Sequence, residues 1–142
     1  MSFLPRRRVV APVDFSDRSV EVVKTARDIA GVQGQVLVVH VLPELSPTDP
    51  GVIWETIDDS SRIEKAGRTL RDTYPADDPS KTRFEVVVGD PGHEVAAIAE
   101  RTSADLIVVA SHGRTGVKRL LIGSVAERIV RLAHCPVLVL RS

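Results

Sequence analysis

The sequence predicts a doubly wound, Rossmann-like α/β domain that is built on a parallel β-sheet. Five short segments rich in Val, Ile and Leu recur along the chain, and segments with helical periodicity lie between them. Most of the five are apolar at nearly every position, which is typical of strands that helices bury on both faces. Because parallel neighbours require crossover connections, this alternation favours a doubly wound sheet. At 142 residues, residues 1–142 are expected to form a single domain.

The expected strands follow the apolar segments. They span Arg8 to Val13, Gln35 to Leu42, Thr82 to Val88, Asp105 to Ala110 and Pro136 to Leu140.

The first two helices are expected between the first three strands. One spans Asp17 to Ala30, where apolar residues form a single stripe, and Ser16 can cap its start and Gly31 its end. The other spans Val52 to Thr73 and follows an irregular lead-in that is rich in proline.

Two further helices complete the alternation. Asp90 and Pro91 form a natural cap and first-turn pair for the third helix. The fourth spans Ser124 to Ala133, and each of the four helices therefore lies between two consecutive strands.

The composition restricts the class of function. Lys and Arg residues number 19 and so do Asp and Glu residues, so no general field attracts nucleic acid or acidic lipid. No apolar stretch approaches the roughly 20 residues of a membrane span, and Met1 to Val13 lacks the features of a signal peptide. Cys135 is the only cysteine, which agrees with a reducing compartment. We therefore expect a cytoplasmic protein that binds neither nucleic acid nor membrane.

The exits of the first and fourth strands carry the candidate binding residues. In open parallel sheets, ligands bind outside the carboxyl ends of the strands, where the strand order reverses. The first exit contains Pro12, Val13 and Asp14.

The fourth exit has the features of a phosphate site. It reads Ala110-Ser-His-Gly-Arg-Thr-Gly116, and Gly123 and Ser124 then open the last helix. Glycines let backbone amides approach an anion, and a helix N-terminus offers unpaired N–H groups with partial positive charge. The alternative is that the glycines only form turns and that Ser124 only caps its helix. The residues by themselves leave both interpretations open.

The spacing of these residues resembles the phosphate loop of the universal stress protein family. Its nucleotide-binding members carry Gly-x-x-Gly, nine residues, and then Gly-Ser or Gly-Thr. Ala110 to Gly113, the nine residues Arg114 to Ile122, and Gly123-Ser124 fit this pattern with one change. The segment Val10 to Ser16 is similar to the opening strand and turn of the family. The resemblance covers nearly the whole chain.

This resemblance implies a fold and a ligand. The implied fold is a five-stranded parallel sheet ordered 3-2-1-4-5, of the adenine nucleotide alpha hydrolase-like type, with helices on both faces. The implied ligand is ATP or another adenine nucleotide, with Mg²⁺ or Mn²⁺ held through the nucleotide. Asp14 would lie near the ribose, the phosphates or this cation, and the backbone of Val41 would hold the adenine edge. The implied cofactor-binding residues are Pro12, Val13, Asp14, Val41, Ala110, Ser111, His112, Gly113, Arg114, Gly116, Gly123, Ser124 and Val125.

Two positions depart from the family pattern. Ala110 stands where the first glycine of the motif is expected, and Val13 stands at a position often held by Thr. The methyl group of Ala110 can obstruct the approach of a phosphate, and Val13 removes one hydroxyl contact. Because Gly113 and Gly123 are retained, the phosphate loop itself is expected to remain.

Several residues have simpler interpretations. Asp14 can also cap the first helix, and His40 lies in an apolar strand, where a hydrogen-bonded core histidine is expected. Cys135 is expected to be a buried structural thiol, because its neighbour His134 points to the opposite face of an extended segment. Ser111 lacks the preceding glycine and the directly following helix of a nucleophile elbow. No hydrolase triad and no catalytic residue are therefore expected.

The expected function is that of a non-enzymatic stress-response or signalling module that binds ATP. The alternatives are a nucleotide-free interaction protein of the same fold, and a slow ATPase that uses Asp14 and a divalent cation. The last strand, Val137 to Leu140, would lie at the sheet edge. The resemblance suggests that two copies pair there as a homodimer.

Overall fold

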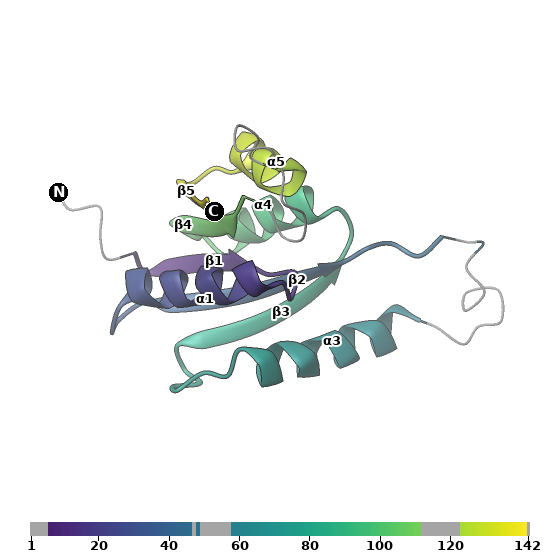
Figure 1. The fold of residues 1–142 in the computed structure, drawn as a ribbon, viewed down its shortest axis with the longest axis horizontal. Coiled ribbons are helices and arrows are strands. Elements are labelled where there is room, and N and C mark those ends of the chain that lie inside the picture. Colours follow the sequence, from purple (N-terminus) through teal and green to yellow (C-terminus); the bar gives the residue numbers. More distant parts are fainter. Residues whose placement is uncertain (1–5, 47, 49–57, 112–122, 142) are drawn as a thin grey trace.

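The computed structural model describes residues 6–46, 48, 58–111 and 123–141. Its five strands form one parallel sheet in the order β3-β2-β1-β4-β5, which confirms the expected fold class and strand order (Figure 1). The elements are β1 (Arg8–Pro12), α1 (Asp17–Ala30), β2 (Gln35–Leu42), α3 (Asp59–Thr73), β3 (Thr82–Val88), α4 (Pro91–Arg101), β4 (Leu106–Ala110), α5 (Ser124–Leu132) and β5 (Val137–Leu140).

Three strands are one residue shorter than expected. β1 ends before Val13, β4 begins after Asp105, and β5 begins after Pro136. Pro136 has no N–H with which to enter the ladder. The carboxylate of Asp105 accepts hydrogen bonds from the backbone amides of Arg7 and Arg8 at 3.0 and 3.1 Å, so this residue connects to the entrance of β1 instead of extending β4.

The two ends of α1 are capped in different ways. Ser16 occupies the N-cap position with extended backbone, but its side chain forms no capping hydrogen bond. The expected side-chain cap is therefore wrong, and the amide of Ser19 instead donates to the backbone carbonyl of Ser16 at 3.0 Å. Gly31 ends the helix as expected, because its φ of 68° suits glycine and its amide donates to the carbonyl of Arg27.

The other helices begin and end at identifiable caps. α3 starts after Asp58, whose carboxylate accepts from the amide of Ser61 at 2.7 Å; the expected start of this helix, residues 52–57, lies outside the described residues. Asp90 caps α4 by accepting from the amide of His93, as predicted. α5 ends one residue earlier than expected, since Ala133 has an extended backbone.

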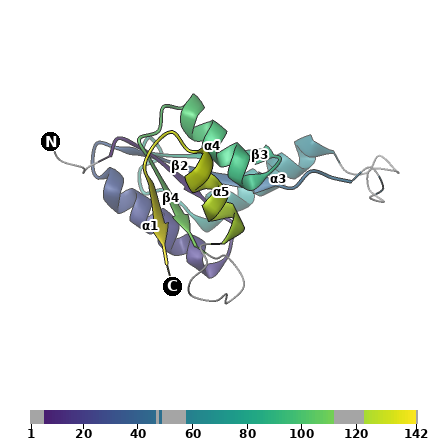
Figure 2. The ribbon, with the colours of Figure 1, turned by 90° about the horizontal axis from the view of Figure 1, so that it is seen from above.

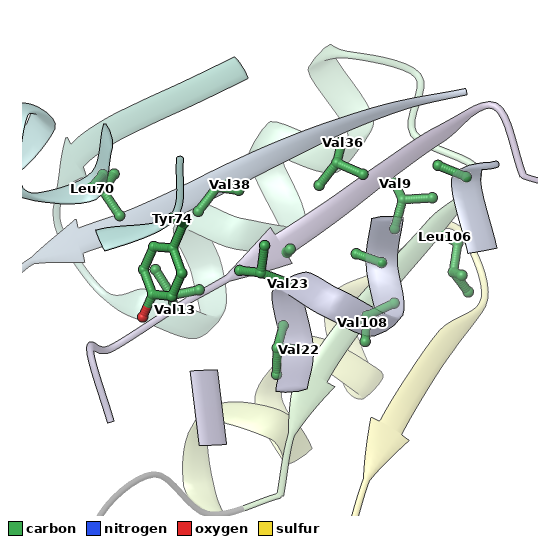
Figure 3. Packing of buried hydrophobic residues seen from close by; sticks show 13 residues of the cluster. Val9, Val13, Val22, Val23, Val36, Val38, Leu70, Tyr74, Leu106 and Val108 are labelled. Carbon is green, nitrogen blue, oxygen red and sulfur yellow. The ribbon is translucent and has the colours of Figure 1, made fainter. Parts of the chain in front are cut away.

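Helices cover both faces of the sheet, which explains the continuous apolar strands (Figure 2). Side chains alternate along β1 and enter two buried clusters. Val9 and Ala11 belong to the cluster beneath α1, which also contains residues of α3, and Val10 belongs to the cluster beneath α4, which also contains residues of α5. Figure 3 shows the cluster beneath α1, in which Tyr74, the residue after α3, lies beside Val13. Within the described residues, no helix is long and apolar enough to cross a membrane.

Gly92 allows α4 and α5 to approach each other closely. A Cβ atom at position 92 would lie 2.6 Å from Cβ of Arg128 on α5, well inside van der Waals contact. We expect Gly92→Ala to push the two helices apart and to lower the free energy of unfolding by about 1–3 kcal/mol. Urea unfolding followed by circular dichroism measures this change.

Gly67→Ala in α3 is the matched control. Among the described residues, a Cβ atom there would meet only the end of the Arg71 side chain, at 3.4 Å. Since alanine has the higher helix propensity, this substitution should raise the free energy of unfolding by about 0.5–1 kcal/mol. Effects of the same sign at both glycines would contradict the packing argument.

Candidate functional site

The carboxyl ends of β1 and β4 lie side by side in the middle of the sheet. Val9 pairs with Leu106 and Val10 with Ile107, and the same register continued to the last residue of β1 brings Pro12 level with Val109. The chain runs outward from β1 to β2 and β3 on one side and to β4 and β5 on the other. The two candidate exits therefore meet where the strand order reverses, which is the usual ligand position in such sheets.

A compact turn after β1 orients Asp14. Its Oδ1 atom accepts hydrogen bonds from the amide of Ser16 at 3.0 Å and from the hydroxyl of Ser19 at 2.9 Å, and its own amide donates to the same hydroxyl at 3.0 Å. Ser19 is buried in the first turn of α1, whereas Asp14 is exposed. One carboxylate oxygen is thus held in place, and Oδ2 accepts no hydrogen bond from the described part of the chain.

These contacts keep Asp14 ionised. Partial burial acts to raise the pKa of its carboxyl group, but the hydrogen bonds from Ser16 and Ser19 outweigh it, and the net pKa lies below the ordinary 3.8. Since the pKa of Asp14 is lower in the folded state, its ionised carboxylate stabilises the fold at pH values above the ordinary pKa. This stabilisation is lost as the pH falls through the pKa of the folded state.

The residue after Asp14 has an unusual backbone conformation that sequence reasoning missed. Phe15 has a φ of 64°, which a bulky residue rarely adopts. Its ring lies 4.6 Å from that of His40 and 6.1 Å from that of Tyr74, measured between centroids. These ring contacts hold the strained turn, and no feature of the local sequence marks Phe15 for a positive φ.

His40 connects this turn to β2. Its Nδ1 atom lies 2.8 Å from the carbonyl oxygen of Val13, so Nδ1 carries the proton and donates it. The half-buried histidine is therefore hydrogen-bonded, as predicted, and it holds the backbone that precedes Asp14.

The exit of β4 is described as far as Ser111. This residue is 4% exposed, and its amide donates to the carbonyl of Leu140 at 2.9 Å. The guanidinium group of Arg18 donates to the same carbonyl at 2.8 Å, a contact that the sequence did not indicate. Ala110 is half-buried and packs against the cluster beneath α1. The four remaining loop candidates, His112, Gly113, Arg114 and Gly116, lie outside the described residues.

The first backbone amides of α5 have no acceptor within the helix. Gly123 is the N-cap, with φ 91° and ψ 146°, and Ser124 is the first helical residue. The idea that Ser124 caps this helix is therefore wrong. The first hydrogen bond of the helix runs from the amide of Glu127 to the carbonyl of Gly123, so the amides of Ser124 and Val125 have no carbonyl partner within the helix. Such an end attracts anions.

The backbone of β2 extends beyond its pairing with β1 at Val41. The pairing of β1 with β2 ends at Pro12 and Val39, two residues before Val41, so β1 does not cover the backbone of β2 at that point. On its other side, Val41 pairs with Val87 of β3. The exit of β1 is thus bordered by the turn at Asp14 and, toward β2, by backbone that does not pair with β1.

The structure also describes the surroundings of two further candidates, a metal site and the thiol of Cys135. In the described ranges, no group of three or more His, Cys, Asp or Glu side chains is placed to hold a metal ion. Cys135 was expected to be buried, but it is only half-buried. Burial first and then nearby Asp105 raise the pKa of its thiol, which makes it a poor nucleophile.

The chain is similar in sequence to a known protein family. A family model of the universal stress protein family matches residues 5–141. Universal stress protein MJ0531 of Methanocaldococcus jannaschii is 36% identical over 140 residues, which cover 95% of this chain and 82% of that protein.

Solved structures share the fold. The structure of MJ0577 from the same organism matches with a TM-score of 0.80 at 24% identity and 98% coverage of both chains. The universal stress protein of Archaeoglobus fulgidus, solved in complex with dAMP, matches with a TM-score of 0.58 at 26% identity, again with 98% coverage of both chains.

Proposed function

The chain belongs to the universal stress protein family, and on this premise we propose that it is a stress-response or signalling module that binds ATP or another adenine nucleotide. We also propose that residues 1–142 form a single domain of this kind and that the protein is cytoplasmic. The observation that carries the nucleotide proposal is the start of α5, where Gly123 at φ 91° precedes amides without helical partners. The dAMP complex of the A. fulgidus relative supports an adenine nucleotide as the ligand.

The phosphates would be bound between the exit of β4 and the start of α5. In this proposal the amides of Ser124 and Val125 donate to phosphate oxygens, and His112, Gly113, Arg114 and Gly116 complete the loop with Ser111. Ala110 replaces the first motif glycine. The contact of Ala110 with the cluster beneath α1 supports a methyl group that lies in the core and does not block the phosphates.

The nucleoside would lie over the exits of β1 and β2. We propose that Pro12 and Val13 line the ribose side and that the backbone of Val41, uncovered by β1, contacts the adenine edge. An ionised Asp14 repels phosphate, so its second carboxylate oxygen, Oδ2, is suited to a ribose hydroxyl or to a Mg²⁺ or Mn²⁺ ion that the phosphates share. A bound cation would supply positive charge there and would take most of its ligands from the nucleotide and water.

Titration calorimetry with ATP and Mg²⁺, combined with mass spectrometry of nucleotide released from the purified protein, tests the proposal. We expect a saturable binding heat or a co-purified adenine nucleotide. If neither is found, the chain is a nucleotide-free interaction protein of the same fold.

Asp14→Asn should weaken the binding of ATP with Mg²⁺. The amide keeps the size of the side chain and one acceptor oxygen, but it loses the charge that attracts a cation. We expect the affinity for Mg²⁺-ATP to fall about 5- to 30-fold, in line with a lost charge-assisted contact of about 1–2 kcal/mol. Calorimetry with and without Mg²⁺ measures the difference.

Asp78→Asn is the matched control. Asp78 forms a similar turn, in which its Oδ1 accepts from the amide and the hydroxyl of Ser80 at 3.0 and 2.7 Å. The turn precedes β3, at the amino edge of the sheet. Equal losses of ATP affinity in the two variants would show that Asp14 acts only through the stability of its turn.

We propose that bound ATP is hydrolysed slowly or not at all. Among the described residues of the site, 12–16, 110, 111 and 123–125, Asp14 is the one carboxylate, and its lowered pKa makes it a weak base for attacking water. Phosphate release in the presence of Mg²⁺ distinguishes this binding module from the slow ATPase.

We propose a homodimer that forms through β5. This strand is the edge of the sheet, where unpaired backbone groups invite pairing. Leu138 on the strand and Val130 and Leu132 on α5 are 37%, 47% and 40% exposed, which supplies apolar surface for a partner copy. Light scattering should give twice the chain mass at working concentrations, and a monomeric mass would count against the proposal.

A further inference from the structure

A hollow lies at the opposite edge of the sheet from the nucleotide site. It has a volume of about 540 Å³ and is bordered by the amino-terminal residues of β1, β2 and β3 and by the carboxyl end of α4. On this side of the sheet α4 packs against β1 and β2, and α5 packs against β5. The hollow therefore lies next to the part of β3 that carries Arg83 and Glu85, and its size falls within the range of about 300–1,000 Å³ that is common for small-molecule sites.

Part of the lining of the hollow is apolar, and we call this part its floor. Its lining includes Val10, Leu37 and Ala104. Val10 and Leu37 belong to or pack against the cluster beneath α4, as does Ala104. Leu37 and Ala104 are only half-buried, so part of their surface remains available to a ligand.

The rim of the hollow is positively charged. Arg8, Arg83 and Arg101 come from three different elements and are accompanied by one acidic residue, Glu85. Arg101 forms two hydrogen bonds with Glu85, at 3.0 and 2.9 Å, and Arg8 donates to the carbonyl of Thr102 at 3.2 Å, which offsets the negative end of α4. The exposed guanidinium group of Arg83 has no hydrogen bond or ion pair with any residue that the structure describes.

From this combination we propose that the hollow is a second ligand site, for a small organic anion with an apolar body. The apolar part would cover Leu37 and Ala104, and the anionic group, a carboxylate, phosphate or sulfonate, would pair with Arg83. A neutral apolar ligand would leave Arg83 unpaired, and a fully polar anion would leave the floor uncovered. The site is independent of nucleotide binding because it uses the amino ends of the strands.

A pair of fluorescent probes that differ in charge tests the proposal. 8-Anilinonaphthalene-1-sulfonate carries a sulfonate on an aromatic body, and N-phenyl-1-naphthylamine has the same kind of body without charge. Arg83→Gln keeps a polar side chain without the positive charge, and it breaks no hydrogen bond or ion pair among the described residues. Arg131→Gln on α5, whose side chain is 73% exposed and is paired with Glu127, is the matched control for the loss of one positive charge.

We expect saturable fluorescence enhancement of the sulfonate probe with the intact protein. Arg83→Gln should raise its Kd about 5-fold or more, as expected for a lost ion pair at a partly desolvated site, and Arg131→Gln should leave it unchanged. The Kd of the neutral probe should not respond to either substitution. Thermal unfolding followed by circular dichroism checks that Arg83→Gln is folded.

Three results would overturn the proposal. The first is the absence of saturable binding of the sulfonate probe. The second is an unchanged Kd in Arg83→Gln, which would place the probe elsewhere on the surface. The third is an equal loss of both probes in Arg83→Gln, which would indicate a change of structure and not a lost anion contact.

Discussion

Replacing Gly123 with valine is expected to reduce the affinity for Mg²⁺-ATP about 30-fold or more. Gly123 has a φ of 91° at the N-cap of α5, a conformation that a β-branched residue adopts only with strain. Valine would move the backbone that leads into the helix and place a side chain where the phosphates approach. Hydrogen bonds to a charged group contribute about 1.5–3 kcal/mol each, so the loss of one or two from the first turn of α5 accounts for an effect of this size. Titration calorimetry on the two proteins measures it.

Gly31→Val provides the control for backbone strain. Gly31 also has a positive φ, 68°, but it ends α1 just before β2 begins, at the amino edge of the sheet. Both variants should therefore lose stability, whereas only Gly123→Val should lose ATP binding. If Gly123→Val binds ATP as tightly as the natural sequence, the proposed position of the phosphates is wrong.

The largest effect on stability is expected from truncation of Ile129. This residue is 0% exposed and packs α5 onto the sheet in the cluster that contains Val10 and Ile107. Ile129→Ala removes three carbon atoms and leaves a cavity, so the free energy of unfolding should fall by about 2–5 kcal/mol. Ile129→Val, which removes one methylene group, should cost about 0.5–1.5 kcal/mol. Urea unfolding followed by circular dichroism gives both values.

Val130→Ala tests the same helix at its exposed side. Val130 is 47% exposed, so its truncation in the monomer should change the free energy of unfolding by no more than about 0.5 kcal/mol. Similar costs for Ile129→Ala and Val130→Ala would mean that α5 is not seated on the sheet through Ile129.

The elements with strong local signals were predicted well. β2, β3 and α1 have the expected bounds, because a segment rich in apolar residues or a single apolar stripe is visible without knowledge of the partner. The same holds for Asp90 and Gly31, whose capping roles depend only on the helix that they adjoin. Strand ends were less certain, since the side-chain bonds of Asp105 to the entrance of β1 join residues about a hundred positions apart.

The candidate site was predicted in outline but not in its detailed contacts. The two exits were expected to meet, and the register of β1 and β4 brings them together. Three residues that shape the site were missed, namely Phe15, Arg18 and Ser19. Ser19 was assigned only to a helix, yet its hydroxyl both donates to and accepts from Asp14, and the expected cap at Ser16 forms no side-chain bond.

The sequence by itself determined the periodicity of the strands and helices, and with it the parallel α/β class. It also carried the spacing of Gly123 and Ser124 from the fourth strand, which indicated a phosphate site. Tertiary structure alone decided which groups meet at the sheet edge. The carbonyl of Leu140 accepts hydrogen bonds from Ser111 and from Arg18, which lies 122 positions away in the chain. Local sequence encodes which faces are apolar, but contacts of this kind depend on strand order and on the way the helices pack over the sheet.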